Sequence, residues 1–120
     1  MHELSIATRV VEIAAEAARD ANATKVTAIT LRIGVLSAVQ EGALQWAFRV
    51  AAEGSLLEGA VLRVVQVPLT IFCSVCGETV EPVSVQELAC PCCGALSGDV
   101  RTGQEMEVDT LTIVDDTDEA

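Results

Sequence analysis

The sequence has few aromatic residues and few cations. Among its 120 residues there are one tryptophan, two phenylalanines and no tyrosine, although the hydrophobic fraction is 51%. The core must therefore be built from aliphatic side chains, and aromatic platforms for stacking nucleic-acid bases are scarce. Seven Lys and Arg against eighteen Asp and Glu give a formal net charge of −11. Such a chain lacks the cations that a phosphate backbone or an anionic membrane attracts, so we expect neither as a partner.

Signals for export and for catalysis are also missing. No apolar run reaches the length of a membrane span, and the first residues, Met1-His2-Glu3, lack the basic segment of a secretion signal. We therefore expect a cytoplasmic protein with reduced thiols. The sequence shows no nucleophile paired with a base, no phosphate-binding loop and no converging carboxylates. These absences predict that the protein is not an enzyme.

Four of the five cysteines form two Cys-x-x-Cys pairs. Cys73 and Cys76 make the first pair, Cys90 and Cys93 make the second, and a glycine follows each pair. Two intervening residues let one tight turn point both sulfurs at the same ion, and two such turns complete the tetrahedral shell of Zn²⁺. The glycine permits the positive φ that such a turn needs. The spacing predicts a structural zinc site with four thiolate ligands.

Other uses of the cysteines fit less well. Disulfides are uncommon in a reducing compartment, and a redox Cys-x-x-Cys usually opens a helix in a βαβ unit. Cys92, the fifth thiol, could replace Cys90 or Cys93 as a ligand or remain free, but the repeated spacing favours the other two. A redox enzyme that uses these thiols is a weaker alternative, because zinc-bound thiolates are not free for exchange. A zinc-ribbon adaptor for nucleic acid or a polymerase fits the cysteines but not the acidic composition.

The rest of the chain shows helical and strand periodicities. We expect helices over 4–21 and 39–52, and strands over 25–33, 60–67 and 106–114. The strand at 60–67 is apolar on both faces, which predicts a central position in its sheet. The apolar stripe expected on the first helix contains Ile6, Val10, Ile13, Ala14, Ala17 and Ala21, and that on the second contains Ala43, Ala47, Val50 and Ala51.

These elements predict an α+β fold in which two helices lie on one face of a three-stranded sheet. A zinc-ribbon-like module, residues 69–97, is inserted between the second and third strands. Residues 1–68 and 98–114 would form the main domain, and the acidic residues 115–120 a disordered tail. The module is too small to fold without its ion, so the zinc site is expected to be a folding device.

His2 is the only histidine, and it stands beside the α-amino group of the chain. A lone histidine near a terminus is usually incidental. Here, however, the Met1 amine, the His2 amide nitrogen and the His2 ring nitrogen can reach one ion. Their two chelate rings lie in one plane, which suits Ni²⁺ or Cu²⁺ rather than zinc. The Glu3 carboxylate or amide could add a ligand. Three nitrogens leave the plane incomplete, so the ion would be held loosely enough to be passed on.

With Met1-His2-Glu3-Leu4-Ser5 opening a helix and two Cys-x-x-Cys pairs interrupting a later sheet, the sequence resembles the HypA family. The resemblance covers almost the whole chain, including Gly34-Val-Leu-Ser37 after the first strand. It implies a nickel metallochaperone for [NiFe]-hydrogenase maturation, with a transient Ni(II) site and a structural Zn(II) site. The residues that match are Met1, His2 and Glu3 for nickel, and Cys73, Cys76, Cys90 and Cys93 for zinc.

The same resemblance implies partners. Members of the family hand nickel to the hydrogenase large subunit with the help of a HypB-type GTPase. Some also serve urease maturation, so urease accessory proteins are candidate partners. Two features of this sequence depart from the family pattern. Cys92 adds a thiol inside the second pair, and no histidine flanks the cysteines, so a histidine-dependent change of zinc ligation is not available here.

Overall fold

The chain divides into two compact units, which are described one at a time. The computed structural model describes residues 3–115. Within that range the first unit comprises residues 3–32, 39–65 and 107–115, and the second comprises residues 33–38 and 66–106. Each unit is therefore assembled from segments that are separate in the sequence. None of the helices within 3–115 is both long enough and apolar enough to cross a membrane.

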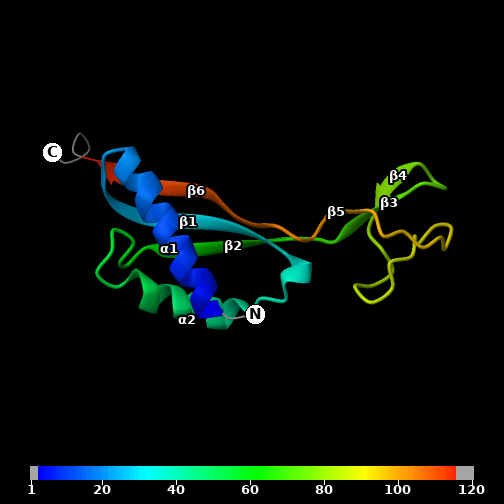
Figure 1. The fold of residues 1–120 in the computed structure, drawn as a ribbon, viewed down its shortest axis with the longest axis horizontal. Helices are drawn as coiled ribbons and strands as arrows, with labels where there is room; N and C mark the ends of the chain where they lie inside the picture. The colour runs from blue at the N-terminus through cyan, green and yellow to red at the C-terminus, as the bar shows by residue number, and fades with distance from the viewer. Residues whose placement is uncertain (1–2, 116–120) are drawn as a thin grey trace. The chain divides into compact units, whose positions relative to one another are not determined.

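The first unit contains two helices and most of a three-stranded sheet. Helix α1 spans Glu3–Asp20 and α2 spans Glu41–Ala52. The strands are β1 (Ala23–Gly34), β2 (Val61–Val67) and β6 (Met106–Asp115), in the order β2-β1-β6. The two helices pack against each other, and Figure 1 shows α1 lying across the strands. This arrangement confirms the predicted α+β fold.

The buried faces of the helices are rotated from those predicted. On α1, Val10 and Ala14 are buried as expected, but Ile13 is 41% exposed. The stripe that α1 buries is made mostly of small residues, namely Ala7, Val10, Val11, Ala14, Ala15 and Ala18. Alanines let two helices approach closely, so the narrow alanine stripe is covered and the bulkier isoleucine stays outside. On α2 the buried set is Leu44, Ala47, Phe48 and Ala52, which leaves the predicted Ala43 and Val50 exposed.

The prediction that strand 60–67 is central was wrong, because β1 is the central strand and β2 lies at an edge. Leu62 and Val67 are buried on β2, but Val61 is 54% exposed and Val65 is also exposed. An apolar run indicates a central strand only when both of its faces are covered, and here the outer valines remain in solvent. The Gln45 side chain of α2 donates from Nε2 to the Leu62 carbonyl at 2.8 Å.

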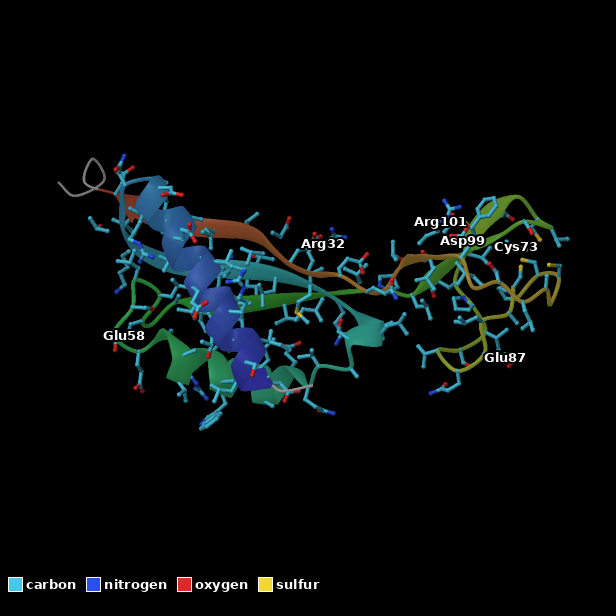
Figure 2. The ribbon with its side chains drawn as sticks, in the orientation of Figure 1. Arg32, Glu58, Cys73, Glu87, Asp99 and Arg101 are labelled. Atoms are coloured by element: carbon cyan, nitrogen blue, oxygen red, sulfur yellow. The ribbon has the colours of Figure 1, made fainter. Side chains whose placement is uncertain are left out.

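Strands β1 and β6 run antiparallel although about 80 residues separate them in the sequence. Thr24 Oγ1 donates to the Val114 carbonyl at 3.2 Å, and Thr27 Oγ1 donates to the Thr112 carbonyl at 3.3 Å. Arg32 pairs with Glu107 at 2.7 Å; Figure 2 labels Arg32. These contacts join two segments of the first unit that lie far apart in the sequence. Of the predicted disordered tail, 115–120, all but Asp115 lies outside the described residues, and Asp115 ends β6.

The second unit is built on a small sheet that leads directly to the cysteines. Its strands are β3 (Thr70–Cys73), β4 (Glu78–Val80) and β5 (Val100–Thr102), in the order β4-β3-β5. Both pairings are antiparallel, and Cys73 lies opposite Glu78. Arg101 donates two hydrogen bonds to the Asp99 carboxylate, at 2.9 and 2.8 Å, and its guanidinium lies 4.7 Å from the centre of the Phe72 ring. Figure 2 shows this pair beside the end of β3.

Two glycines let two backbone segments of the second unit touch. The Gly34 amide donates to the Glu105 carbonyl at 2.8 Å, and the Leu36 amide donates to the Gly103 carbonyl at 2.9 Å. A Cβ atom at Gly34 would lie 2.1 Å from the Gly103 carbonyl carbon. That neighbour is backbone and cannot rotate away as a side chain could. Gly34 is therefore required by the close approach itself, and not only by chain flexibility.

We expect Gly34→Ala to destabilise the protein by about 2–3 kcal/mol, because the added methyl group must force the two segments apart. The matched control is Gly42→Ala on α2, where a Cβ would meet nothing within 4 Å. This control should be neutral or stabilising by up to about 1 kcal/mol, since alanine favours helix. Urea unfolding of the zinc-loaded protein measures both changes. Equal stabilities for the two variants would contradict the close approach at Gly34.

Candidate metal centre

The first cysteine pair forms a tight turn at the end of β3. Cys73 is the last residue of the strand and is buried. The Cys76 amide donates to the Cys73 sulfur at 3.4 Å, and the Gly77 amide donates to the Cys73 carbonyl at 2.7 Å. Gly77 has φ +72°. The turn therefore needs the glycine for the reason that the sequence indicated, and the Cys76 amide points toward the sulfur that would carry charge.

The second pair repeats this geometry in a loop. The Gly94 amide donates to the Cys90 carbonyl at 2.8 Å, and Gly94 has φ +76°. The Cys90 amide donates to the Ala95 carbonyl at 2.9 Å. An isolated bridge between Ala89 and Leu96 brackets the loop. Both turns are thus shaped by local hydrogen bonds within a few residues of their cysteines.

The two turns face each other and bring four sulfurs together. The Sγ atoms of Cys73, Cys76, Cys90 and Cys93 all lie within 4.8 Å of one another. Two of the separations join one turn to the other, at 3.5 Å from Cys73 to Cys93 and 3.9 Å from Cys76 to Cys90. A regular tetrahedron with Zn–S bonds of about 2.3 Å places its sulfurs about 3.8 Å apart. The sulfur cluster is therefore close in size to the shell of a tetrahedral zinc ion.

The four-sulfur cluster is half buried, and it would supply all four ligands of a tetrahedral ion. Cys73 and Cys90 are buried, Cys76 and Cys93 are exposed, and all five cysteines are free thiols. Four protein ligands leave a tetrahedral ion no open position for water or substrate, which is the arrangement of structural rather than catalytic zinc. The cluster can hold a metal and order the loops around it.

Without a metal, these thiols cannot all ionise. Hydrogen bonds with the thiols of Cys93, Cys90 and Cys73 raise the pKa of Cys76 to about 12. The pKa of Cys93 is also raised: the Ala95 amide opposes the shift, but the contact with Cys73 and desolvation outweigh it. The amides of Cys93 and Cys92 lower the pKa of Cys90 to about 7. Cys90 is therefore the first thiolate to form, and a dication must displace the protons from the others.

Cys92 is separate from this cluster. Its side chain is exposed, and its sulfur is not among the four that converge. The nearby charge of Cys90 and, to a lesser degree, desolvation raise the pKa of the Cys92 thiol. A raised pKa leaves little thiolate at neutral pH, which makes Cys92 a poor nucleophile. The geometry therefore favours Cys90 and Cys93 over Cys92 as ligands and weakens the redox alternative.

Of the three predicted nickel ligands, Met1 and His2 lie outside the described residues, and Glu3 is the first residue of α1. Glu3 Oε2 accepts a hydrogen bond from the Gln40 amide at 3.3 Å, and Gln40 is the residue before α2. Glu3 thus belongs to the first unit, whereas the four cysteines belong to the second. No sequence signal pointed to Gln40 as its partner, because the two residues are 37 positions apart.

The comparisons with known proteins point to one family. Residues 1–113 match the family model described as hydrogenase/urease nickel incorporation, metallochaperone, hypA. The chain is 48% identical over 120 residues to the hydrogenase maturation factor HypA of Roseiflexus sp. (strain RS-1), covering 100% of this chain and 98% of that protein. It is 41% identical over 111 residues to the factor of the same name from Chloroflexus aggregans, covering 92% and 97% of the two chains.

Solved structures show the same similarity. The solution structure of the Ni metallochaperone HypA from Helicobacter pylori matches with a TM-score of 0.69 at 25% sequence identity, covering 97% of this chain and 100% of that one. A solution structure of HypA protein also matches with a TM-score of 0.69, covering 95% of this chain and 97% of that one.

We expect Cys73→Ser to abolish tight zinc binding, because the variant removes a buried member of the sulfur cluster. The matched control is Cys92→Ser, which removes the thiol outside the cluster and should retain about one zinc ion per chain. Elemental analysis after dialysis against a weak chelator measures both. Loss of zinc from Cys92→Ser, with retention by Cys73→Ser, would show that the ligands are wrongly assigned.

Zinc affinity should rise steeply with pH. The ligands must be thiolates, and the raised pKa values of Cys76 and Cys93 mean that each thiol releases a proton when zinc binds near neutral pH. Below about pH 7, Cys90 contributes a further proton. Competition titrations with a chromogenic chelator should therefore show affinity increasing by about two decades or more per pH unit. An affinity independent of pH would contradict a thiolate shell.

Proposed function

This chain belongs to the HypA family, and from that premise we propose that it binds Ni(II) at its N-terminus and delivers the ion to the [NiFe]-hydrogenase large subunit. The family consists of metallochaperones for hydrogenase and urease nickel incorporation and not of enzymes. The match runs over residues 1–113, so it includes the N-terminal Met-His-Glu and both cysteine pairs. The proposal rests on this match, because it covers both sets of proposed metal ligands.

The nickel site is proposed at the first residues of the chain. The Met1 amine, the His2 amide and the His2 ring nitrogen form a planar donor set suited to Ni(II), and Glu3 adds a ligand through its amide or carboxylate. An amine has a pKa near 8 and an imidazole a pKa near 6.5, so both must lose protons before nickel binds. The hydrogen bond from the Gln40 amide to the Glu3 carboxylate holds the start of α1 beside the start of α2. That contact anchors Glu3 within the proposed site.

The ion held by the cysteines is proposed to be a resident Zn(II). Cys73, Cys76, Cys90 and Cys93 would hold it, and it would order the zinc module that the sequence placed at residues 69–97. The main domain, proposed at 1–68 and 98–114, would then carry the nickel site. The softness of the four sulfurs and their tetrahedral spacing favour zinc over nickel at this cluster.

A HypB-type GTPase and the hydrogenase large subunit are the proposed partners, with urease accessory proteins as further candidates. Curated relatives of the chain carry the name hydrogenase maturation factor, which supports partners in that process. The net charge of −11 supports protein partners rather than nucleic acid or membranes. We propose a cytoplasmic location, because the cysteine cluster needs reduced thiols.

We expect His2→Ala to abolish nickel binding, since the variant removes the ring nitrogen from the donor set. Zinc content should stay at about one ion per chain, because the variant leaves all four sulfurs in place. Calorimetric titration with NiCl₂ of protein with a native, untagged N-terminus measures the change, and elemental analysis measures zinc.

A second protein with two residues added before Met1 is the matched control for the amine. The addition converts the amine into an amide without changing any side chain, so nickel affinity should also fall. If both proteins bound nickel as tightly as the unaltered chain, the N-terminal site would be disproved even though the family assignment would stand.

A further inference from the structure

The second unit carries an open groove that the metal centre does not use. Three segments line it: Val35 after β1, residues 66–69 at the end of β2, and part of the loop 81–85 after β4. Its volume is about 340 Å³. This is near the lower end of the range of about 300–1,000 Å³ that is typical of ligand sites. A groove of this size accommodates a few side chains of a partner, not a large folded surface.

The groove is apolar and preformed. Val67 and Leu69 are buried and form its floor, whereas Val35 and Val85 stand more than 40% exposed at its sides. Pro68 and Pro82 are among the lining residues and hold the backbone in place. Proline has no amide hydrogen, so these walls offer fewer main-chain donors for adding a strand. Recognition must therefore come mainly from side chains that cover the exposed valines.

The charge around the groove has one sign. Glu81 is the only charged residue in the lining, and it has no ion pair among the described residues. Arg101 is the only cation in residues 33–38 and 66–106, and its guanidinium forms an ion pair with Asp99. The same residues contain five carboxylates, at Glu78, Glu81, Glu87, Asp99 and Glu105. An acidic occupant would be repelled, and a cationic one would be attracted.

We propose that this groove binds a short, extended segment of a partner protein, one that is apolar and carries a Lys or Arg opposite Glu81. A second copy of this chain is a poor occupant because each copy carries a net charge of −11. The acidic residues 115–120 of the chain itself also carry the wrong sign. The small volume predicts weak binding, which suits a protein that must leave its partner after each delivery. The inference does not depend on the nickel site.

The test uses two short fluorescein-labelled peptides and the full-length, zinc-loaded protein. One peptide is a short run of valines with a lysine at each end, and the other has a glutamate at each end in place of the lysine. Alternate valines of the extended chain can then enter the groove, and the long side chain of a terminal charged residue can reach Glu81. Fluorescence anisotropy should show binding of the lysine peptide that weakens with salt, and at least about tenfold weaker binding of the glutamate peptide.

Two pairs of variants locate the binding. Val85→Ser should lower the affinity for the lysine peptide about tenfold, because Val85 lines the groove. Val75→Ser is its control: Val75 is 71% exposed but lies outside the groove. Glu81→Gln should weaken binding about threefold and reduce the salt dependence. Glu87→Gln removes an exposed carboxylate that does not line the groove and should leave the affinity unchanged.

Several outcomes would overturn the proposal. These are the absence of lysine-peptide binding at millimolar concentration, equal binding of both peptides, and equal effects within either pair of variants. Zinc analysis of every variant shows that the second unit keeps its ion, so a loss of peptide binding is not a loss of folding.

Discussion

The second unit depends on a charge balance among four cysteine sulfurs. Its strands are three or four residues long, which is too little sheet to bury a substantial core. Two glycine turns place the sulfurs about as far apart as a tetrahedral zinc shell requires. Four thiolates this close would repel one another, and hydrogen bonds with the neighbouring thiols already raise the pKa of Cys76. A dication removes this repulsion, and zinc binding of about 10–16 kcal/mol can replace the missing core.

The first unit is stabilised differently, by packing and by contacts between distant segments. The alanine-rich stripe of α1 brings this helix close to α2. Strand β1 pairs with β6, although most of the second unit lies between them in the sequence. None of these contacts involves a proposed nickel ligand, so they would persist when nickel leaves the proposed N-terminal site. The proposed donors there are nitrogens, and those in the second unit are sulfurs. This difference in ligand type would keep a transient nickel ion and a resident zinc ion at separate sites.

The periodicity of the sequence predicted where the helices and strands of the first unit occur, but not which faces they bury. It did not predict the three short strands of the second unit. A spacing of 3.6 residues places Val10 and Ala14 on one side of α1. It does not distinguish a stripe through Ile13 from one through Ala7 and Ala18, because that choice depends on how closely α2 approaches. For the same reason the apolar run of β2 was mistaken for a central strand. Its place at the edge follows from the pairing of β1 with β6, which no local pattern records.

The cysteine turns were determined by the sequence alone, because each involves hydrogen bonds and a positive φ within five consecutive residues. Chemistry confined to so short a segment does not depend on the rest of the fold. Two features came only from the tertiary structure: the contact of Glu3 with Gln40 and the groove beside Glu81. Each brings together segments separated by more than ten residues. Closing the intervening loops costs conformational entropy, and interactions throughout the folded chain must offset that cost. A short stretch of sequence does not show whether they do.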